Sequence, residues 1–192
     1  MAYQKNYGDK NFELGAFGLW TALYPGRDRS TGQADHYTDL GLDASFQYFA
    51  PNKDVFTLNG RYVHEGRRWS ASQPLGLVLN PTGELNDLHL DASYYWRDKI
   101  GFSFGGFDTW GSSDPVLYAA NRTFRPDSSG LVFQLDATPF GNGSPLGDRF
   151  NTRFGVQYFV YGAFNGASRN FDGANSNASN NDTVRVFAWV YY

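Results

Sequence analysis

Hydrophobic and polar residues alternate along most of this chain with a period of two. Residues 39–48 show the pattern clearly: Leu40, Leu42, Ala44, Phe46 and Tyr48 alternate with Asp39, Gly41, Asp43, Ser45 and Gln47. This is the period of a β-strand with one apolar and one polar face. It predicts eight strands, over residues 11–23, 39–48, 55–65, 87–97, 100–108, 130–138, 150–163 and 184–192.

The apolar positions chosen for these eight strands carry no charged residue. Each strand has about ten residues, which is the length a tilted strand needs to cross a bilayer. An arginine or lysine that faces lipid costs about 2–4 kcal/mol at the middle of the membrane. Exposure of the apolar face to lipid therefore explains the missing charges.

The predicted connections alternate in length. Long connections run over 25–35, 66–84, 111–128 and 165–182, and shorter ones over 50–54, 97–99 and 139–148. Long outer loops and short periplasmic turns are typical of outer-membrane barrels. We therefore predict an all-β, antiparallel transmembrane β-barrel of the bacterial outer membrane, in a single domain over 1–192, with both chain ends on the periplasmic side.

Composition excludes several classes of function and argues against a competing fold. Charged residues make up 18% and aromatic residues 18%, the net charge is −3, and there is no cysteine. The charge argues against nucleic-acid binding, and the missing thiols exclude a disulfide scaffold, a thiolate metal site and covalent haem attachment. We predict no cofactor and no resident metal. A soluble, lipocalin-like barrel is the competing fold, but its exterior should be rich in lysine, and the chain has four: Lys5, Lys10, Lys53 and Lys99.

Aromatic residues cluster near the strand ends, where amphipathic rings favour the headgroup layer of a membrane. The predicted periplasmic girdle contains Phe12, Tyr48, Phe56, Tyr94, Trp96 and Tyr192, and the outer girdle contains Tyr62, Trp69 and Trp110.

The polar faces supply a predicted lumen wall. It consists of Asp39, Asp43, Arg61, Glu65, Asp87, His89, Asp91, Asp136, Arg153 and Arg185. Six acids against three arginines predict a mild cation preference that salt screens. The expected function is passive diffusion of small hydrophilic solutes or ions.

The last residues carry a resemblance. Phe164-Asn-Gly, Asn170-Phe-Asp-Gly, Asn177-Ala-Ser-Asn-Asn-Asp-Thr and Ala188-Trp, followed by the terminal aromatic Tyr192, resemble the closing hairpin of a proteobacterial porin-like outer-membrane family. The resemblance implies that the barrel-assembly machinery recognises the C-terminal strand. It also implies a larger barrel whose signal peptide and first half lie upstream, and it suggests a second role, as a sheath around an electron-transfer cytochrome.

Two further signals favour a fragment of a larger barrel. Residues 1–4 read as the end of a strand, followed by a short turn, in parallel with 48–60. Small residues at inward positions, such as Gly41, Gly101, Gly105 and Gly155, suit a wide interior better than a filled one. The alternative is a complete eight-stranded barrel, in which ion pairs fill the interior and the protein has a non-conducting structural or adhesive role. Homo-oligomers are compatible with either form.

An enzymatic function and a metal site have weaker support. His36, His64 and Asp108 near the outer rim are the candidates for a hydrolase, but their spacing does not indicate a triad, so we predict that the protein is not an enzyme. The oxygen-rich loop around Asp172 and Asp182 has no EF-hand spacing and is typical of turns. The apolar loop segment with Leu75, Leu77 and Leu79 either constricts the lumen or packs locally.

Overall fold

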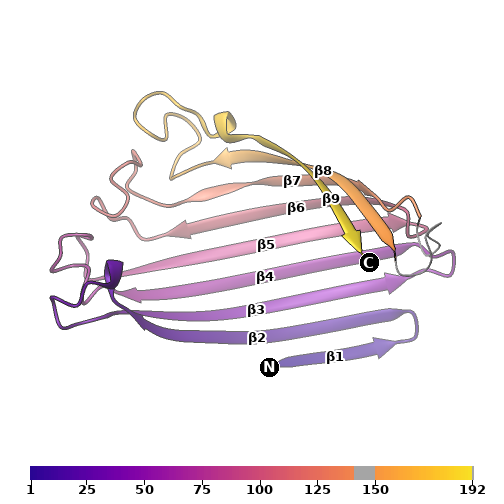
Figure 1. Cartoon of the computed structure of the whole chain (residues 1–192), viewed down its shortest axis with the longest axis horizontal. Helices are drawn as coiled ribbons and strands as arrows, with labels where there is room; N and C mark the ends of the chain where they lie inside the picture. Colours follow the sequence, from indigo (N-terminus) through magenta and orange to yellow (C-terminus); the bar gives the residue numbers. More distant parts are fainter. Residues whose placement is uncertain (141–149, 192) are drawn as a thin grey trace.

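One antiparallel sheet, in which each strand pairs with the next along the chain, dominates the structure (Figure 1). The computed structural model describes residues 1–140 and 150–191. The strands are β1 (Ala2–Tyr7), β2 (Lys10–Leu23), β3 (Asp35–Phe49), β4 (Val55–Arg68), β5 (Thr82–Trp96), β6 (Ile100–Gly111), β7 (Ser128–Ala137), β8 (Asn151–Ala163) and β9 (Thr183–Tyr191). Two short 3-10 helices, η1 (Pro25–Arg27) and η2 (Ala178–Asn181), lie in loops.

All eight predicted strands are present, but the predicted strand count is wrong. A ninth strand, β1, pairs with β2 from Ala2 opposite Gly15 to Tyr7 opposite Lys10. Residues 2–4 therefore lie in a strand, as predicted, but the strand continues to Tyr7 through residues that were expected to form the turn. The tight turn between the two strands uses Gly8 at φ 61°, a conformation that favours glycine.

The sheet is open, in contrast to the closed barrel of the prediction. Within the described residues, β1 and β9 form its two edges. The backbone of β2 from Phe17 to Leu23 has no partner on the side of β1, whose ladder ends at Ala16. Alternation along a strand determines which residues share a face, but it carries no information on which strands close a sheet.

Over β3–β8 the two faces of the sheet differ in exposure. Many large apolar side chains on one face are exposed, for example Leu42 at 57%, Leu90 at 55% and Leu135 at 54%. On the other face, most polar side chains are partly shielded by their neighbours, and Asp136 is 3% exposed. We call these the apolar face and the polar face.

Buried hydrophobic side chains lie in the loops. Trp69, Ala71 and Val78 belong to the connection between β4 and β5, and Ala178 belongs to η2. These four are the hydrophobic residues that are buried among the described positions. The sheet therefore has little hydrophobic core of its own.

The connections alternate in length, as predicted. Long loops 24–34, 69–81, 112–127 and 164–182 leave one end of the sheet, and short turns 8–9, 50–54 and 97–99 leave the other (Figure 1). The remaining connection, 138–150, contains residues outside the described ranges. We refer to the two ends as the loop end and the turn end.

Aromatic rings cover glycines on the polar face. Phe17 lies opposite Gly41, Tyr95 opposite Gly101, Phe107 opposite Gly130, and Phe187 opposite Gly155. A Cβ atom at any of these four glycines would come within 3.0 Å of the ring. The ring of a cross-strand neighbour therefore covers each of these glycines, an arrangement known from other sheets. That these small residues also suit a wide interior stays a prediction.

Candidate functional site

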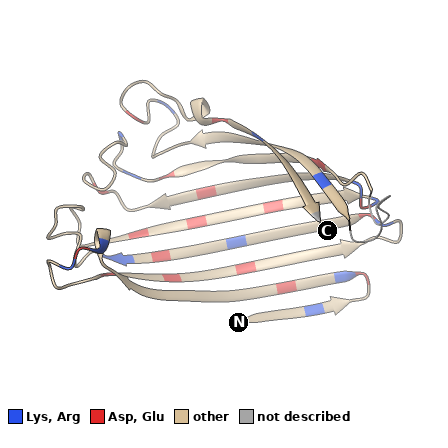
Figure 2. Ribbon diagram, viewed as in Figure 1, with Lys and Arg blue, Asp and Glu red and all other residues tan. Residues whose placement is uncertain are grey.

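The ten residues predicted to form the lumen wall share one face of the sheet. Their positions follow from the register: Asp43 lies opposite Arg61, which lies opposite His89, and Asp39 lies opposite Glu65. Figure 2 shows acidic positions along β3 and β5 and a basic position on β8. The shared face is a property of the sheet, whereas its role as a lumen wall stays a prediction.

A first cluster on the polar face surrounds Asp87 of β5. Its carboxylate lies 3.6 Å from Nη2 of Arg61 and 3.1 Å from Nε2 of His89, and it accepts a 2.8 Å hydrogen bond from the hydroxyl of Thr109. Arg61 is 54% exposed and Asp87 27% exposed. Solvent therefore reaches the Arg61–Asp87 ion pair, which contributes little to stability.

A hydrogen-bonded chain crosses from β3 to β5 next to this cluster. Ser45 donates to Oδ1 of Asn59 at 2.9 Å, and Nδ2 of Asn59 donates to Asp91 at 2.8 Å. The amide of Asn59 thus fixes the orientation of the Asp91 carboxylate without neutralising its charge.

A second network on the polar face surrounds the buried Asp136 of β7. Its carboxylate, 1% exposed, receives two hydrogen bonds from Arg153, at 2.8 and 3.0 Å, and one from Nε2 of Gln134 at 2.7 Å. Arg153 also donates to the hydroxyl of Tyr95. Gln157 donates to Gln134 at 2.6 Å and extends the network. Tyr95 and the two glutamines are not among the predicted wall residues.

Two hollows lie on the polar face between these networks. One, of about 270 Å³, is lined by His89, Asp91, Ser103, Gln134 and Gln157 among others. The other, of about 130 Å³, is lined by Gln134, Gln157, Arg153, Arg185, Phe187 and Trp189. The two share both glutamines, so an acid-bearing region and an arginine-bearing region meet there.

Two buried aspartates organise the loop end. Asp35, 1% exposed, accepts hydrogen bonds from the backbone N–H groups of Ala71 and Ser72 at 2.7 and 3.0 Å, and from the hydroxyl of Ser72. Asp114 accepts the N–H groups of Leu79, Asn80, Val116 and Leu117 at 2.9–3.1 Å. Burial disfavours the Asp114 carboxylate, but these backbone hydrogen bonds outweigh burial and lower its pKa.

The segment proposed as a constriction is tied to this loop region. The backbone of Leu79 is held by Asp114, Val78 is buried, and Leu77 and Leu79 remain 49% and 57% exposed. Local packing is thus visible, and constriction of a lumen by Leu75, Leu77 and Leu79 stays a prediction.

Most of the predicted girdle residues lie in rows on the apolar face. At the turn end, Tyr48 lies opposite Phe56 and Phe56 opposite Tyr94, with Phe12 and Trp96 on the adjacent strand ends. At the loop end, Tyr62 stacks on Trp110 at 6.2 Å. Trp69 differs, because it is 8% exposed and packs edge-on against Tyr37 within the loops. Tyr192 lies outside the described residues.

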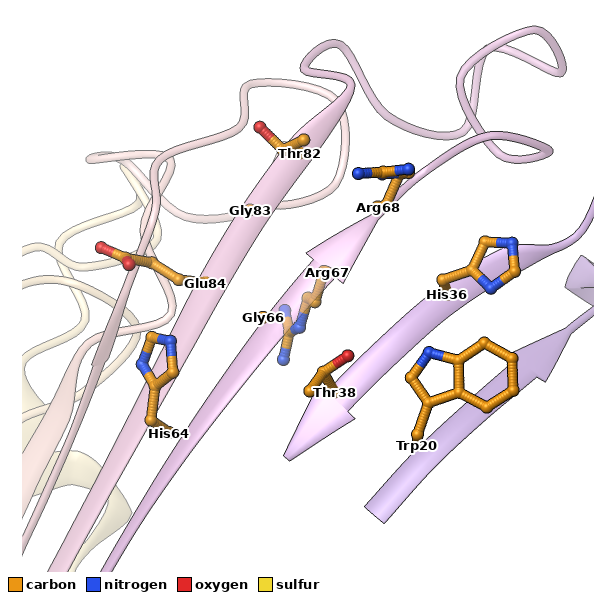
Figure 3. A pocket seen from close by; sticks show the side chains of 10 residues that line it. All are labelled: Trp20, His36, Thr38, His64, Gly66, Arg67, Arg68, Thr82, Gly83 and Glu84. Atoms are coloured by element: carbon orange, nitrogen blue, oxygen red, sulfur yellow. The ribbon is translucent and has the colours of Figure 1, made fainter. Parts of the chain in front are cut away.

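The apolar face also carries one polar pocket, of about 500 Å³, at the loop end of β2–β5 (Figure 3). Its lining includes Trp20, His36, Thr38, His64, Arg68, Thr82 and Glu84. Two candidates for a hydrolase, His36 and His64, therefore lie in one pocket. The third, Asp108, lines a different, largely apolar hollow on β6, and the polar pocket has no serine in its lining.

The loop after β8 is rich in carboxylate and amide oxygens. Asp172 accepts the N–H groups of Ala174 and Ser176 at 2.8 and 3.1 Å, and its bonds to Ser176 and Ala174 lower its pKa. Within residues 1–140 and 150–191 there is no group of three or more acidic or histidine side chains placed to hold a metal ion. The aspartate thus acts as a turn residue.

Comparison with known protein families, with curated proteins and with solved structures finds no match for this chain. The resemblance to a porin-like family therefore stays a prediction. Among the described residues, no helix has the length and apolar character needed to span a membrane.

Proposed function

We propose that this chain forms part of an outer-membrane β-barrel that lets small hydrophilic solutes or ions diffuse across the membrane. The observation that carries the proposal is the exposed apolar face. Leucine, phenylalanine and valine side chains lie uncovered across most of the sheet, while the buried hydrophobic residues among those described lie in loops. Exposed apolar patches of this extent on soluble monomers are rare, and lipid is the environment that such a face suits.

Charges on the polar face support an aqueous, cation-preferring path. Arginine neutralises Asp87 and Asp136. Within the described part of the chain, no lysine or arginine lies within ion-pair distance of Asp39, Asp43 or Asp91. No cationic side chain among the described residues balances these carboxylates, and fixed negative charge raises the local concentration of cations.

The open edges indicate that further strands complete the structure. Unpaired backbone N–H and C=O groups cost several kcal/mol each in hydrocarbon, which is why spanning sheets close into barrels. The edges at β1 and β9 therefore need partner strands in the membrane. The outer leaflet, the assembly machinery and small polar solutes are the partners that this proposal requires.

Conductance in planar bilayers tests the proposal. The protein is reconstituted and its reversal potential is measured in a KCl gradient. We expect a cation-selective potential that shrinks as salt rises, because salt screens the wall. A zero or anion-selective potential contradicts the cation preference, and a complete lack of conductance contradicts a channel and favours a structural barrel.

Two aspartates on opposite faces provide a matched pair of variants. Asp91→Asn removes a charge from the polar face and should move the potential toward zero. Asp108→Asn removes the same charge from the apolar face, where Asp108 lies between Leu88 of β5 and Ser129 of β7, and should leave the potential unchanged. Equal effects of the two variants would contradict a path along the polar face.

A further inference from the structure

The apolar face is divided into a polar and an apolar zone along a line that crosses three strands. On β3, His36 and Thr38 are followed by Leu40 and Leu42 at the next positions of this face. The same change occurs on the neighbouring strands, counted from the loop end toward the turn end. On β4, Arg68, Gly66 and His64 are followed by Tyr62 and Leu58. On β5, Thr82, Glu84 and Asn86 are followed by Leu88 and Leu90. From Leu40 to Tyr48 the apolar zone extends about 27 Å along the strand, comparable with the apolar band of about 25 Å in outer-membrane barrels.

The polar pocket lies just beyond this line, at the height where lipid headgroups meet a barrel. Its position on the apolar face separates it from the proposed solute path, because alternate residues of the same strands point to the other face. Any ligand of the pocket therefore approaches from the lipid side.

An arginine without a partner occupies the pocket. The guanidinium of Arg68 is exposed and makes no ion pair or side-chain hydrogen bond within the described residues. His36, on the adjacent strand position, stacks on Trp20 at 5.8 Å, so its ring is held beside Arg68. The hydroxyls of Thr38 and Thr82 line the same space.

The single acid of the pocket lies on the far side. Glu84 points away from Arg68 and His36 in Figure 3, toward the side where His64 lies. His64 is itself held by Asn86, whose side-chain oxygen lies 2.9 Å from Nδ1. The half of the pocket formed by Arg68, His36 and the two threonines therefore presents hydrogen-bond donors and positive charge.

We infer that this half-pocket binds the phosphate of an outer-leaflet lipid, an inference that rests on the proposed membrane function. A guanidinium fork matches a phosphate geometrically, and hydroxyls and an imidazole complete its hydrogen bonds. Leu40 and Leu42, exposed by 60% and 57%, continue from the pocket toward the turn end and offer a surface to the acyl chains. The ligand is thus a phosphate joined to an apolar tail.

Fluorescence quenching in neutral detergent micelles tests this inference. Phosphatidic acid with brominated acyl chains is titrated against brominated diacylglycerol, which has the same tails but no phosphate, and quenching of tryptophan fluorescence reports binding. Trp20→Phe identifies the part of the signal that comes from the pocket. We expect phosphatidic acid to bind about tenfold more tightly than diacylglycerol, the effect of about one charge-assisted hydrogen bond.

Variants at two positions of β4 distinguish binding at the pocket from an effect of the protein's net charge. Arg68→Gln should remove most of the preference for phosphatidic acid, and Arg68→Lys should keep part of it because the charge remains. Arg61→Gln removes the same charge from the opposite face of β4 and should keep the full preference. Unchanged preference in Arg68→Gln overturns the inference, as does equal binding of the two lipids by the original protein.

Inorganic phosphate distinguishes a lipid site from a site for a soluble anion. Displacement of phosphatidic acid by millimolar phosphate overturns the assignment to a lipid, and persistence of binding supports it. Flotation of the protein with neutral vesicles is measured in parallel. Failure to float contradicts the proposed membrane function, whereas flotation with no preference for phosphatidic acid contradicts this inference alone.

Discussion

In this molecule the loops bury apolar side chains and the sheet exposes them. In water-soluble domains the strands bury apolar side chains and the loops lie exposed and polar. Here Leu42 and Leu90 in the strands are more than half exposed, while Ala71 and Val78 in a loop are buried. The loops thus form a small water-compatible core, and the sheet presents its apolar side chains outward.

In the proposed function, this contrast corresponds to two surroundings, water for the loops and lipid for the apolar face of the sheet. Loop segments are held by buried carboxylates that accept backbone N–H groups, as Asp35 and Asp114 do, which is how irregular backbone is satisfied. The strands need no such anchors because their ladders pair the backbone, and their apolar face is left uncovered. Four changes test how far the two regions differ.

The largest effect is expected from the buried charge of the sheet. Asp136→Ala leaves Arg153 without the carboxylate that it contacts at 2.8 Å, and breaking a buried pair costs about 3–5 kcal/mol. Urea unfolding in micelles measures the free energy of unfolding. The double variant Asp136→Ala/Arg153→Met should recover much of the loss. A single-variant loss below about 1 kcal/mol would mean that the pair behaves as an exposed one.

Next in size is a charge on the apolar face. Leu90→Arg should destabilise the protein in vesicles by about 2–4 kcal/mol, since in the proposed function this side chain faces hydrocarbon. Ser103→Arg, which places the same charge on the polar face, should cost much less. Vesicle flotation and the shift in gel mobility on heating follow both variants. Similar losses on the two faces would remove the distinction between them.

A smaller effect is expected at the ring-covered glycines. A Cβ at Gly101 would lie 2.3 Å from the ring of Tyr95, so Gly101→Ala must displace the ring and should cost about 1–3 kcal/mol. At Gly106 the nearest atom is 3.6 Å away, and Gly106→Ala serves as the control. Urea unfolding compares the two variants, and equal stability would show that the ring moves freely.

The smallest effect is confined to the loops and depends on pH. The pKa of Asp114 in the folded chain is lowered from its ordinary value of 3.8, so the carboxylate stabilises the loop above that value. The stabilisation should be lost as the pH falls below 3.8 and through the lowered folded pKa. Hydrogen exchange at the amides of Leu79 and Leu117 measures this opening, with Asp114→Asn as the comparison. The quantity compared is the protection factor, the exchange rate relative to that of the unfolded chain at the same pH. A protection factor that does not fall with pH in the original protein would contradict the assignment.

Much of the sheet could be predicted from the sequence, because its signal is local. Period-two alternation located eight strands within a few residues, and it assigned Asp43, Arg61 and His89 to one face, where the register places them. The short strand β1 is missed as a strand in its own right, since six residues give too few alternations to count.

Features that depend on which strands meet could not be predicted in the same way. The network of Asp136 with Tyr95 and Arg153 joins β5, β7 and β8, and the rings over Gly41 and Gly101 depend on cross-strand register. Trp69 looks like a girdle residue in sequence, but the loop fold buries it. The pocket around Arg68 likewise needs four strands in alignment before its residues come together.

The directions of the edge strands restrict how the sheet can close. Every neighbouring pair is antiparallel, so β1 and β9 run the same way. A direct β1–β9 seam would be parallel, and so would the seams of two copies related by a twofold axis along a barrel. An all-antiparallel barrel therefore requires an odd number of added strands, which makes the total even, the parity found in bacterial single-chain barrels.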